Sequence, residues 1–284
     1  MSVVKIKMIK SIEHFSEIEK LYGEIWGSFN KVPLHNLITV ARNGGIVLGA
    51  FNNKEKMVGF SYGFPGVSDL NSGNPRIYLC SHILGILKDY RNLGIGEELK
   101  WEQYDQARKI GFSNIQWTFD PLEAINANLN FHKLGAIGFK YSENCYGFIN
   151  DNLNKGIPTD RLVVDWDVNH TLAQKKSLIS SRRGVKEYYE VGKVIGTEDN
   201  LYWEVGNIEE TSGDIALKLP IPKNIQKIKY SNPDLAKKWR NQFREVIQRL
   251  FAKGFQINDF KQSKKDVNHF YILTKNKDPK VPVE

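Results

Sequence analysis

Residues 76–110 read RIYLCSHILGILKDYRNLGIGEELKWEQYDQARKI, and this stretch decides the fold. Its first part, residues 76–87, is an almost unbroken apolar and aromatic run, which is typical of a central strand buried on both faces. A turn follows over residues 88–94. Apolar residues then recur at intervals of three and four, so the pattern predicts a helix to about Ile110 that Gly111 closes.

The junction of this strand, turn and helix suits a phosphate group. The first amides of a helix have no partner within the helix, and the helix dipole favours an anion there. Gly94 and Gly96 remove side chains where the backbone would approach an anion closely, and Arg91 adds a permanent positive charge. The sequence is neither a P-loop, which ends in Lys-Ser/Thr, nor the three-glycine dinucleotide fingerprint.

The flanking segments add further elements to the sheet. Upstream, we expect a strand over residues 3–9, a helix capped by Ser11 and ended by Gly27, and a hairpin of strands 45–51 and 57–62, followed by a loop over residues 63–75. Downstream, we expect a strand over residues 115–119, a helix over 124–134 and strands near 139–141 and 146–149.

The segment LGILKDYRNLGIG, residues 84–96, resembles the central motif of the GNAT superfamily of N-acyltransferases, including the tyrosine before the arginine. The resemblance covers the order of elements over about residues 3–149. WTFDPLEAINANLNFHKLGA (117–136) and PTDRLVVDW (158–166) resemble a less studied branch with an extra carboxy-terminal segment. It implies an α/β (α+β) fold with a GNAT-like central mixed sheet flanked by helices, and a second smaller α/β lobe.

The resemblance also implies an acyl-coenzyme A site. Backbone groups of Leu84, Gly85 and Ile86 would pair with the pantetheine arm, and the pyrophosphate would lie on the amides of Arg91, Asn92, Leu93, Gly94, Ile95 and Gly96. Asn126 matches an asparagine that contacts the cofactor, although a helix cap explains an asparagine equally well. Phe131 belongs to the same site and stands where many members carry a tyrosine.

Acyl transfer to an amine needs a base, donors for the oxyanion and an acid for the thiolate. His82 is the first candidate base because its ordinary pKa suits proton transfer near neutrality, and a structural histidine is the alternative. Glu123 and Glu143 are the other candidate bases. Phenylalanine cannot donate a proton, so the acid is Tyr141, Tyr146, His132 or water. Arg76 or Arg161 would read a carboxylate of the substrate.

The chain divides, in this prediction, into an acyltransferase domain over residues 1–168 and a smaller basic lobe over 169–284. After a strand near 161–168, a polar stretch over 169–184 has no clear period. The lobe contains expected strands over 215–219, 256–260 and 269–273 and a helix over 233–253. Asn232 caps this helix and Pro233 begins it, and Gly254 ends it.

Charge and composition restrict the class of protein. The chain has 284 residues and a net charge of +8. Residues 1–168 carry 18 basic and 18 acidic side chains, so the whole excess belongs to residues 169–284. No apolar stretch approaches the roughly 20 residues of a membrane span, and two cysteines are too few for a disulfide framework or zinc site. We expect a cytoplasmic protein without metal, in which each cysteine fills a strand position.

The resemblance implies transfer of an acetyl or succinyl group from a coenzyme A thioester to the primary amine of a small metabolite such as an amino acid. Both substrates would be bound together. One alternative is a non-catalytic module that binds acyl-coenzyme A, and turnover distinguishes the two. Another is nucleic-acid binding by the basic lobe, which we do not expect because the sequence contains no recognised motif for it.

Overall fold

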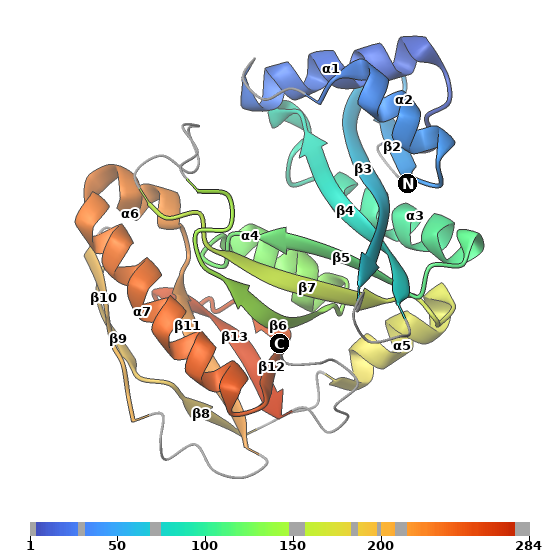
Figure 1. The fold of residues 1–284 in the computed structure, drawn as a ribbon. Coiled ribbons are helices and arrows are strands. Elements are labelled where there is room, and N and C mark those ends of the chain that lie inside the picture. Colours follow the sequence, from blue (N-terminus) through green and yellow to red (C-terminus); the bar gives the residue numbers. More distant parts are fainter. Residues whose placement is uncertain are drawn as a thin grey trace. The chain divides into compact units, whose positions relative to one another are not determined.

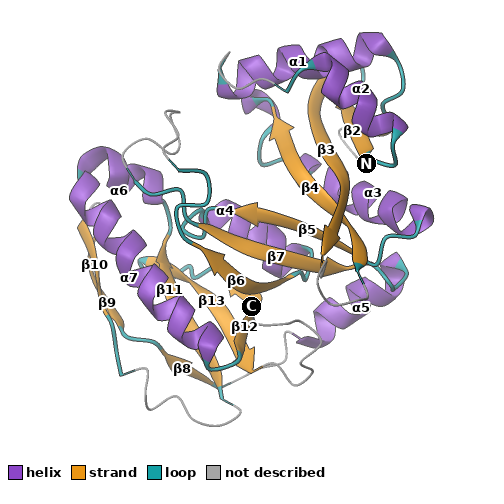
Figure 2. Cartoon of the chain, in the orientation of Figure 1, coloured by secondary structure: helices purple, strands orange, loops and turns teal. Residues whose placement is uncertain are grey.

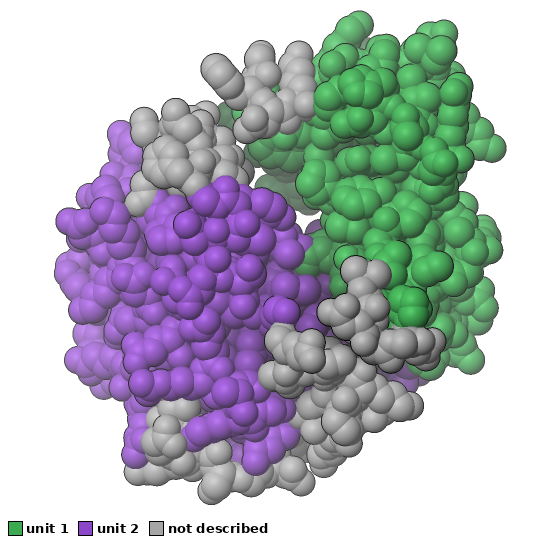
Figure 3. Space-filling view, in the orientation of Figure 1, with its two compact units in different colours: residues 1–117, 166–174 green, residues 118–165, 175–284 purple. Residues whose placement is uncertain are grey.

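The computed structural model describes residues 4–27, 32–68, 75–147, 157–182, 187–197, 200–207 and 215–275. It divides into two compact units, which Figure 3 colours separately. Unit 1 combines residues 1–117 with 166–174, and unit 2 combines residues 118–165 with 175–284. Both contain strands covered by helices (Figure 2), so the protein has the mixed α/β class that the sequence predicts.

Unit 1 is built on a mixed sheet of strands β1 to β5 in sequence order. Neighbouring strands are antiparallel except β4 and β5, which are parallel. The strands are β1 (Lys5–Met8), β2 (Ile46–Phe51), β3 (Met57–Ser68), β4 (Arg76–Ile86) and β5 (Asn114–Phe119), the last of which runs into unit 2. The helices are α1 (Ile12–Trp26), α2 (Leu34–Arg42), a 3₁₀ turn (Lys88–Tyr90) and α3 (Ile95–Ile110) (Figure 1).

Helix α1 follows its local sequence signals. The Ser11 side chain caps it by accepting the His14 amide at 3.3 Å, and Gly27 ends it with a positive φ of 92°. Its buried residues are Phe15, Ile18 and Leu21. The predicted boundaries are therefore confirmed, because cap, apolar stripe and terminating glycine agree.

In unit 2, neighbouring strands follow the order β7, β6, β12, β13, β11, β8. Its strands are β6 (Ile137–Ser142), β7 (Arg161–Asp167), β8 (Tyr188–Glu190), β11 (Ala216–Pro222), β12 (Phe255–Lys261) and β13 (Asn268–Lys275), with a separate hairpin of β9 (Lys193–Thr197) and β10 (Asn200–Glu204). Its helices are α4 (Ala124–Ala127), a π-helix (Asn128–Lys133), α5 (Leu172–Arg182), α6 (Ile225–Ser231) and α7 (Pro233–Ala252). Strand β7 and helix α5 each extend partly into unit 1.

Helix α7 organises the core of unit 2. Asn232 caps it by accepting the Leu235 amide at 3.1 Å, and Pro233 is its first residue, as predicted. Trp239 is fully buried, stacks on Trp203 of β10 at 5.8 Å and donates its indole N–H to the Leu201 carbonyl. The helix also packs against β6 and β12.

The division between the units differs from the predicted boundary at residue 168. Strand β6 pairs with β12 at Gly138 and Ile257, which ties the predicted first domain to the carboxy-terminal segment. Residues 118–165 therefore belong to unit 2, and the second body is larger, not smaller, than the first. Local patterns missed this division because it depends on contacts between residues more than 100 positions apart.

Several predicted elements differ in detail. Strand β3 continues to Ser68, so the loop predicted from residue 63 begins later, and residues 69–74 lie outside the described part. Strand β4 is only partly buried and not buried on both faces. The helix predicted over 124–134 is a single α-turn followed by a π-helix. The second predicted strand near Tyr146 is a turn as far as Gly147, and the rest lies outside the described residues.

Two predictions about the chain as a whole can be compared with the structure. Cys80 fills a position in β4 as expected, but Cys145 lies exposed in a turn. Among the described residues, no helix is both long and apolar enough to cross a membrane.

Candidate active site

A β-bulge at His82 shapes the middle of the unit 1 sheet. Tyr62 of β3 pairs with Ile83 of β4, and Gly63 pairs with Ser81, so His82 is the extra residue. A bulge bends its strand and disturbs the regular alternation of faces. Ser81 consequently faces α3, whereas Gly85 faces α1.

Strand β4 separates from β5 at the same place. The two strands pair at Leu79 with Ile115 and at Cys80 with Gln116, and among the described residues their pairing stops there. Strand β4 nevertheless continues to Ile86. Its backbone groups after Cys80 thus form a strand edge that an extended ligand can join by hydrogen bonds.

Gly85 on this edge is required by packing. A side-chain carbon at Gly85 would lie 2.5 Å from the Trp26 ring of α1 and 3.0 Å from Ile25. The glycine thus lets α1 approach the strand, and any interaction with a ligand would involve its backbone alone.

The turn after β4 presents free amides. Within the described residues, the amides of Asn92, Leu93, Gly94, Ile95 and Gly96 have no protein acceptor. Gly94 is the residue before α3, with φ of 84° and no side-chain cap, and Asn92 also has a positive φ of 62°. This arrangement of successive free N–H groups at a helix start is suited to a phosphate.

Arg91 extends along the same turn. Its Nε donates to the Ile86 carbonyl at 3.1 Å, so one side of the guanidinium ties the turn to the end of β4. The side chain is otherwise exposed. Arg91, which the sequence analysis assigned to the phosphate turn, therefore links this turn to the end of the strand edge.

His82 lies between two aromatic rings on β3. Its ring is 5.7 Å from Tyr62 and 5.7 Å from Phe64, in edge-on contacts. It retains exposed surface, while partial burial of the ring lowers its pKa below the ordinary value of 6.5. The neutral imidazole is the form that can accept a proton, so this environment favours a base at neutral pH.

Lys100 of α3 is a buried amine that the sequence analysis did not identify. It is 4% exposed, and its Nζ donates to Ser81 Oγ at 2.7 Å and lies 3.7 Å from the centre of the Trp117 ring. Burial lowers its pKa to about 7. The burial of Lys100 could not be recognised from the sequence, because a surface lysine in a charged, amphipathic helix has the same sequence context.

The pKa of Lys100 predicts a pH dependence of stability. Between about pH 7 and the ordinary value of 10.5, the unfolded chain binds more protons at this residue than the folded protein does. The free energy of unfolding should therefore rise with pH in this window. Lys100→Met should reduce that rise, measured by urea unfolding at pH 7, 8 and 9. Lys109→Met, at an exposed residue of the same helix, is the control, and equal slopes for Lys100→Met and wild type would contradict the assignment.

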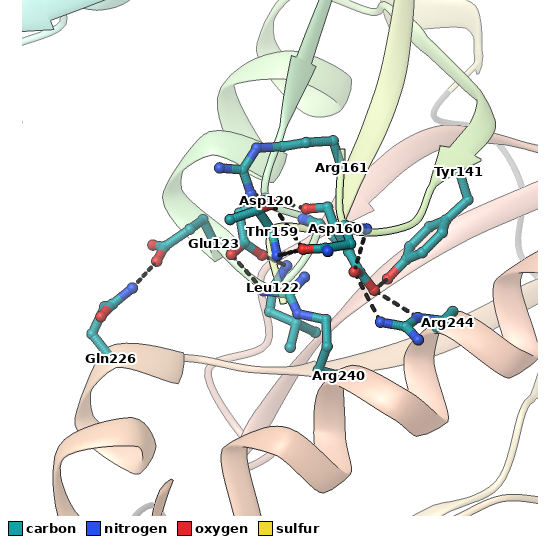
Figure 4. Close-up of polar contacts among 12 residues, drawn as sticks. Asp120, Leu122, Glu123, Tyr141, Thr159, Asp160, Arg161, Gln226, Arg240 and Arg244 are labelled. Carbon is teal, nitrogen blue, oxygen red and sulfur yellow. Dashed lines mark hydrogen bonds and ion pairs between the residues drawn. The ribbon is translucent and has the colours of Figure 1, made fainter. Parts of the chain in front are cut away.

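A cluster of charged side chains forms the centre of unit 2 (Figure 4). Arg240 of α7 is fully buried and donates to Asp120, whose side chain is 12% exposed. Burial opposes the charge on Arg240, but the Asp120 carboxylate outweighs it and raises the pKa of Arg240. Among the residues that the structure describes, the Nε and Nη1 atoms of Arg240 have no hydrogen-bond partner. Asp120 also accepts the Leu122 amide at 2.9 Å, which closes a tight turn.

A second ion pair lies beside the first. Arg244 Nε and Nη2 donate to the two oxygens of Asp160 at 2.8 and 2.9 Å, and Tyr141 donates to Asp160 at 2.6 Å. Burial raises the pKa of Tyr141 well above its usual value. Glu143 pairs with Arg244 at 3.2 Å and accepts from Gln248 at 2.9 Å. Tyr141 and Glu143, both candidate catalytic residues, thus have structural partners within this pair.

Glu123 follows the Asp120 turn and differs from its neighbours. Its carboxylate accepts a hydrogen bond from Gln226 of α6 at 2.5 Å, and in the described part of the chain no cation lies within ion-pair distance. The residue is partly exposed. Burial raises its pKa, and the bond from Gln226 acts in the opposite direction.

The remaining candidates of unit 2 occupy varied environments. Asn126 is exposed in the interior of α4, and Glu123 precedes the helix instead, so the helix-cap alternative for Asn126 is wrong. Phe131 is 1% exposed and packs against Phe119 and Tyr271. It therefore has a core role, and its aromatic ring is not available at the surface.

Three other predicted residues have different surroundings. His132 binds Asp259 at 3.0 Å at a cavity of about 560 Å³. Arg161 is 9% exposed, donates to the Asp160 carbonyl and lies 5.3 Å from the Tyr146 ring centre. Arg76 is exposed at the start of β4 in unit 1.

Several solved structures are similar to part of this chain. No protein-family model and no curated protein matches the sequence. Solved structures similar to this chain include the NatC complex bound to Gag peptide and CoA (17% identity, 59% of this chain and 99% of that chain, TM-score 0.46). They also include yncA from Salmonella typhimurium with its cofactor acetyl-CoA (15% identity, 60% of this chain and 96% of that chain, TM-score 0.47). The ribosomal-protein-S18-alanine N-acetyltransferase from Escherichia coli is a third (12% identity, 59% of this chain and 96% of that chain, TM-score 0.46).

The predicted site residues thus fall into two groups. Unit 1 brings together His82, the strand edge of Leu84, Gly85 and Ile86, and the turn from Arg91 to Gly96. Unit 2 holds the other catalytic and cofactor candidates, together with Arg161. Among the described residues, no group of three or more His, Cys, Asp or Glu side chains could hold a metal ion.

Proposed function

We propose that this protein transfers an acyl group from a coenzyme A thioester to a primary amine. One observation carries the proposal: β4 leaves β5 after Cys80 and runs, through an open strand edge, into a turn with five successive free amides. An extended arm that ends in a pyrophosphate matches both parts, since the edge offers backbone hydrogen bonds and the turn offers N–H groups to an anion.

The residues proposed to hold coenzyme A follow from that match. The backbone of Leu84, Gly85 and Ile86 would pair with the pantetheine arm. The amides of residues 92–96 and the Arg91 guanidinium would hold the pyrophosphate. Asn126 remains a proposed contact because its side chain is exposed, whereas the buried ring of Phe131 supports no direct role.

His82 is the proposed base. It lies on β4 two residues before Leu84, and partial burial favours its neutral form. In a direct transfer with both substrates bound, it accepts the proton of the attacking amine. Tyr141 is less suited to donate a proton to the leaving thiolate, because its hydroxyl is committed to Asp160 and burial raises its pKa.

The acceptor and donor are proposed at the level of chemical class. The acceptor is a small primary amine such as an amino acid, and the acyl group is acetyl or succinyl. Arg76 is the more accessible of the two arginines proposed to read a carboxylate, since Arg161 is nearly buried against Asp160 and Tyr146.

The direct test is turnover. Purified protein is incubated with acetyl-, succinyl- or longer acyl-coenzyme A and a panel of amino acids and polyamines, and free thiol release and acylated product are both measured. Product formation with at least one pair supports the proposal. Saturable coenzyme A binding without product for any pair would instead support the non-catalytic alternative.

The free-amide turn predicts the effect of a Gly94 substitution. A side chain at Gly94 would meet no other atom, but the φ of 84° is strained for β-branched residues. Gly94→Val should therefore distort the turn, at a cost of about 1–2 kcal/mol, and weaken coenzyme A binding about tenfold in calorimetry. Gly94→Asn, which tolerates this conformation, is the control. Unchanged affinity of a folded Gly94→Val variant would place the pyrophosphate elsewhere.

A further inference from the structure

A cavity of about 560 Å³ lies in unit 2, beside the connection between β12 and β13. Its lining comes from the π-helix, β8, β12, β13 and the loop over residues 262–267, all of which belong to unit 2. The volume falls within the range of roughly 300–1,000 Å³ that is usual for small-molecule sites. The cavity is therefore a candidate binding site that needs no residue of unit 1.

Hydrogen bonds hold the loop in place beside the cavity. The Ser263 hydroxyl donates to the Asp266 carboxylate at 2.6 Å and accepts the Asp266 amide at 3.0 Å. The Ser263 amide donates to Nδ1 of His269, on β13, at 3.1 Å. Asp266 itself does not line the cavity, whereas Ser263 and His269 do. The loop is thus fixed against β13 through two residues of the lining.

The contact with Ser263 determines the tautomer of His269. Its Nδ1 accepts an N–H and so carries no proton. Burial, together with the positive charge of Lys223, lowers the pKa of His269 below 6.5, so the ring is neutral at neutral pH and its proton is on Nε2. Within the part of the chain that the structure describes, this N–H has no acceptor. A half-buried hydrogen-bond donor therefore lines the cavity without a partner among those residues.

Two lysines give the lining an excess of positive charge. Lys261 and Lys264 are exposed, and neither has a carboxylate at ion-pair distance among the described residues. Lys261 Nζ lies 5.1 Å from the centre of the Tyr188 ring. Asp259 is the one carboxylate of the lining, and it accepts from Nδ1 of His132 at 3.0 Å and from a backbone amide at 2.7 Å. Two lysines against one carboxylate leave one positive charge, without the histidines.

The cavity also has an apolar part. Ile272 belongs to a buried cluster with Ala216 and Phe270, and the half-buried Tyr188 packs against this cluster. Both Ile272 and Tyr188 line the cavity. An inorganic ion would contact only the polar groups and leave this surface in water, whereas an anion with an apolar body would cover both parts of the lining.

We propose that this cavity binds a small organic monocarboxylate. Its carboxylate would accept the Nε2–H of His269 and pair with Lys261 and Lys264, and its apolar body would lie against Tyr188. One negative charge on the ligand matches the one excess positive charge of the lining, and hydrogen bonds to a charged group are stronger than neutral ones. The proposal does not rest on the acyltransferase activity, because it uses no residue of the proposed coenzyme A site.

The first experiment observes His269 in the full-length protein. Sodium benzoate is titrated into protein that contains ¹⁵N-labelled histidine, and the imidazole signals are followed by NMR, with His269→Asn identifying the signal. Benzoate should shift the Nε2 signal of His269 saturably and leave that of His170 in unit 1 unchanged. Benzamide, which has the same ring without the charge, and sodium chloride at equal ionic strength should shift neither. Equal shifts with all three, or no saturable shift with millimolar benzoate, would overturn the proposal.

Two substitutions of His269 test its N–H. His269→Asn keeps an acceptor for the Ser263 amide but loses the donor at the Nε2 position, so it should raise the Kd for benzoate about tenfold in calorimetry. His269→Gln places an amide N–H near the Nε2 position and should keep most of the affinity. An unchanged Kd in folded His269→Asn would contradict the proposed contact.

The lysines are tested against a neighbour in the same loop. Lys261→Met with Lys264→Met should raise the Kd for benzoate about tenfold, since two exposed charge contacts are lost. Lys265→Met is the matched control, because Lys265 is exposed in this loop but does not line the cavity. Equal Kd values for the double variant and the control would exclude the anion site. Inorganic phosphate should bind more weakly than benzoate, and tighter binding of phosphate would show that the ligand is not a carboxylate.

Discussion

His82→Ala is expected to lower kcat by about 100- to 10,000-fold and to leave the KM for the acyl donor near its wild-type value. The reason is that a general base acts on the proton that leaves in the transition state, whereas binding of the acyl donor uses the backbone of β4 and the following turn. The substitution keeps the same number of residues in β4, so the bulge and the strand edge should remain.

The pH profile separates a catalytic role from a structural one. In wild type, the fall of kcat/KM at acid pH should follow a group with a pKa below 6.5, because partial burial lowers the pKa of His82. This limb should disappear in His82→Ala. His170→Ala is the control, since that side chain is exposed in the same unit. A near-normal kcat across pH would remove His82 from the mechanism, and Glu123 and Glu143 would then be tested as bases.

Arg240→Met is expected to destabilise the protein by about 3–5 kcal/mol, because it leaves the nearly buried carboxylate of Asp120 without its cation. Methionine preserves much of the side-chain volume, so the loss would report mainly on charge. The measurement is urea unfolding, followed by the fluorescence of the tryptophans.

Two further variants show whether the pair is responsible. Asp120→Asn with Arg240→Met should be less destabilised than the sum of the single variants, since the uncompensated charge is removed. Lys237→Met is the matched control on α7, because its pair with Asp234 is exposed and exposed pairs contribute little. A loss below about 1 kcal/mol for Arg240→Met would show that water or another group compensates Asp120.

Elements with strong local signals could be predicted from the sequence. Helices α1 and α7 have a side-chain cap, an apolar stripe and a terminating glycine, and both were placed within a residue or two. The short helix α2 was missed because Leu37 is its only buried residue, which leaves almost no periodic signal. Helix α5 lies in a polar stretch, and strands β8 to β10 are at most five residues long.

The candidate site shows the same limit. The glycine turn and His82 could be recognised because strand, turn and helix are contiguous in sequence. Arg240 looked like one of several basic residues on α7, and Gln226 carried no signal at all, because their partners lie 120 and 103 positions away. Such pairs depend on how the sheet of unit 2 is assembled, which local patterns do not encode.

The bulge in β4 depends on a count of residues. Between the pairs Gly63–Ser81 and Tyr62–Ile83, β4 has one residue more than β3. Any amino acid at position 82 preserves this surplus, so substitutions there change the chemistry of the side chain and leave the bulge in place. Deleting residue 82 would instead make the two strands equal in length and remove the bulge. Among proteins that share the site, we therefore expect insertions and deletions at this position to be rarer than substitutions.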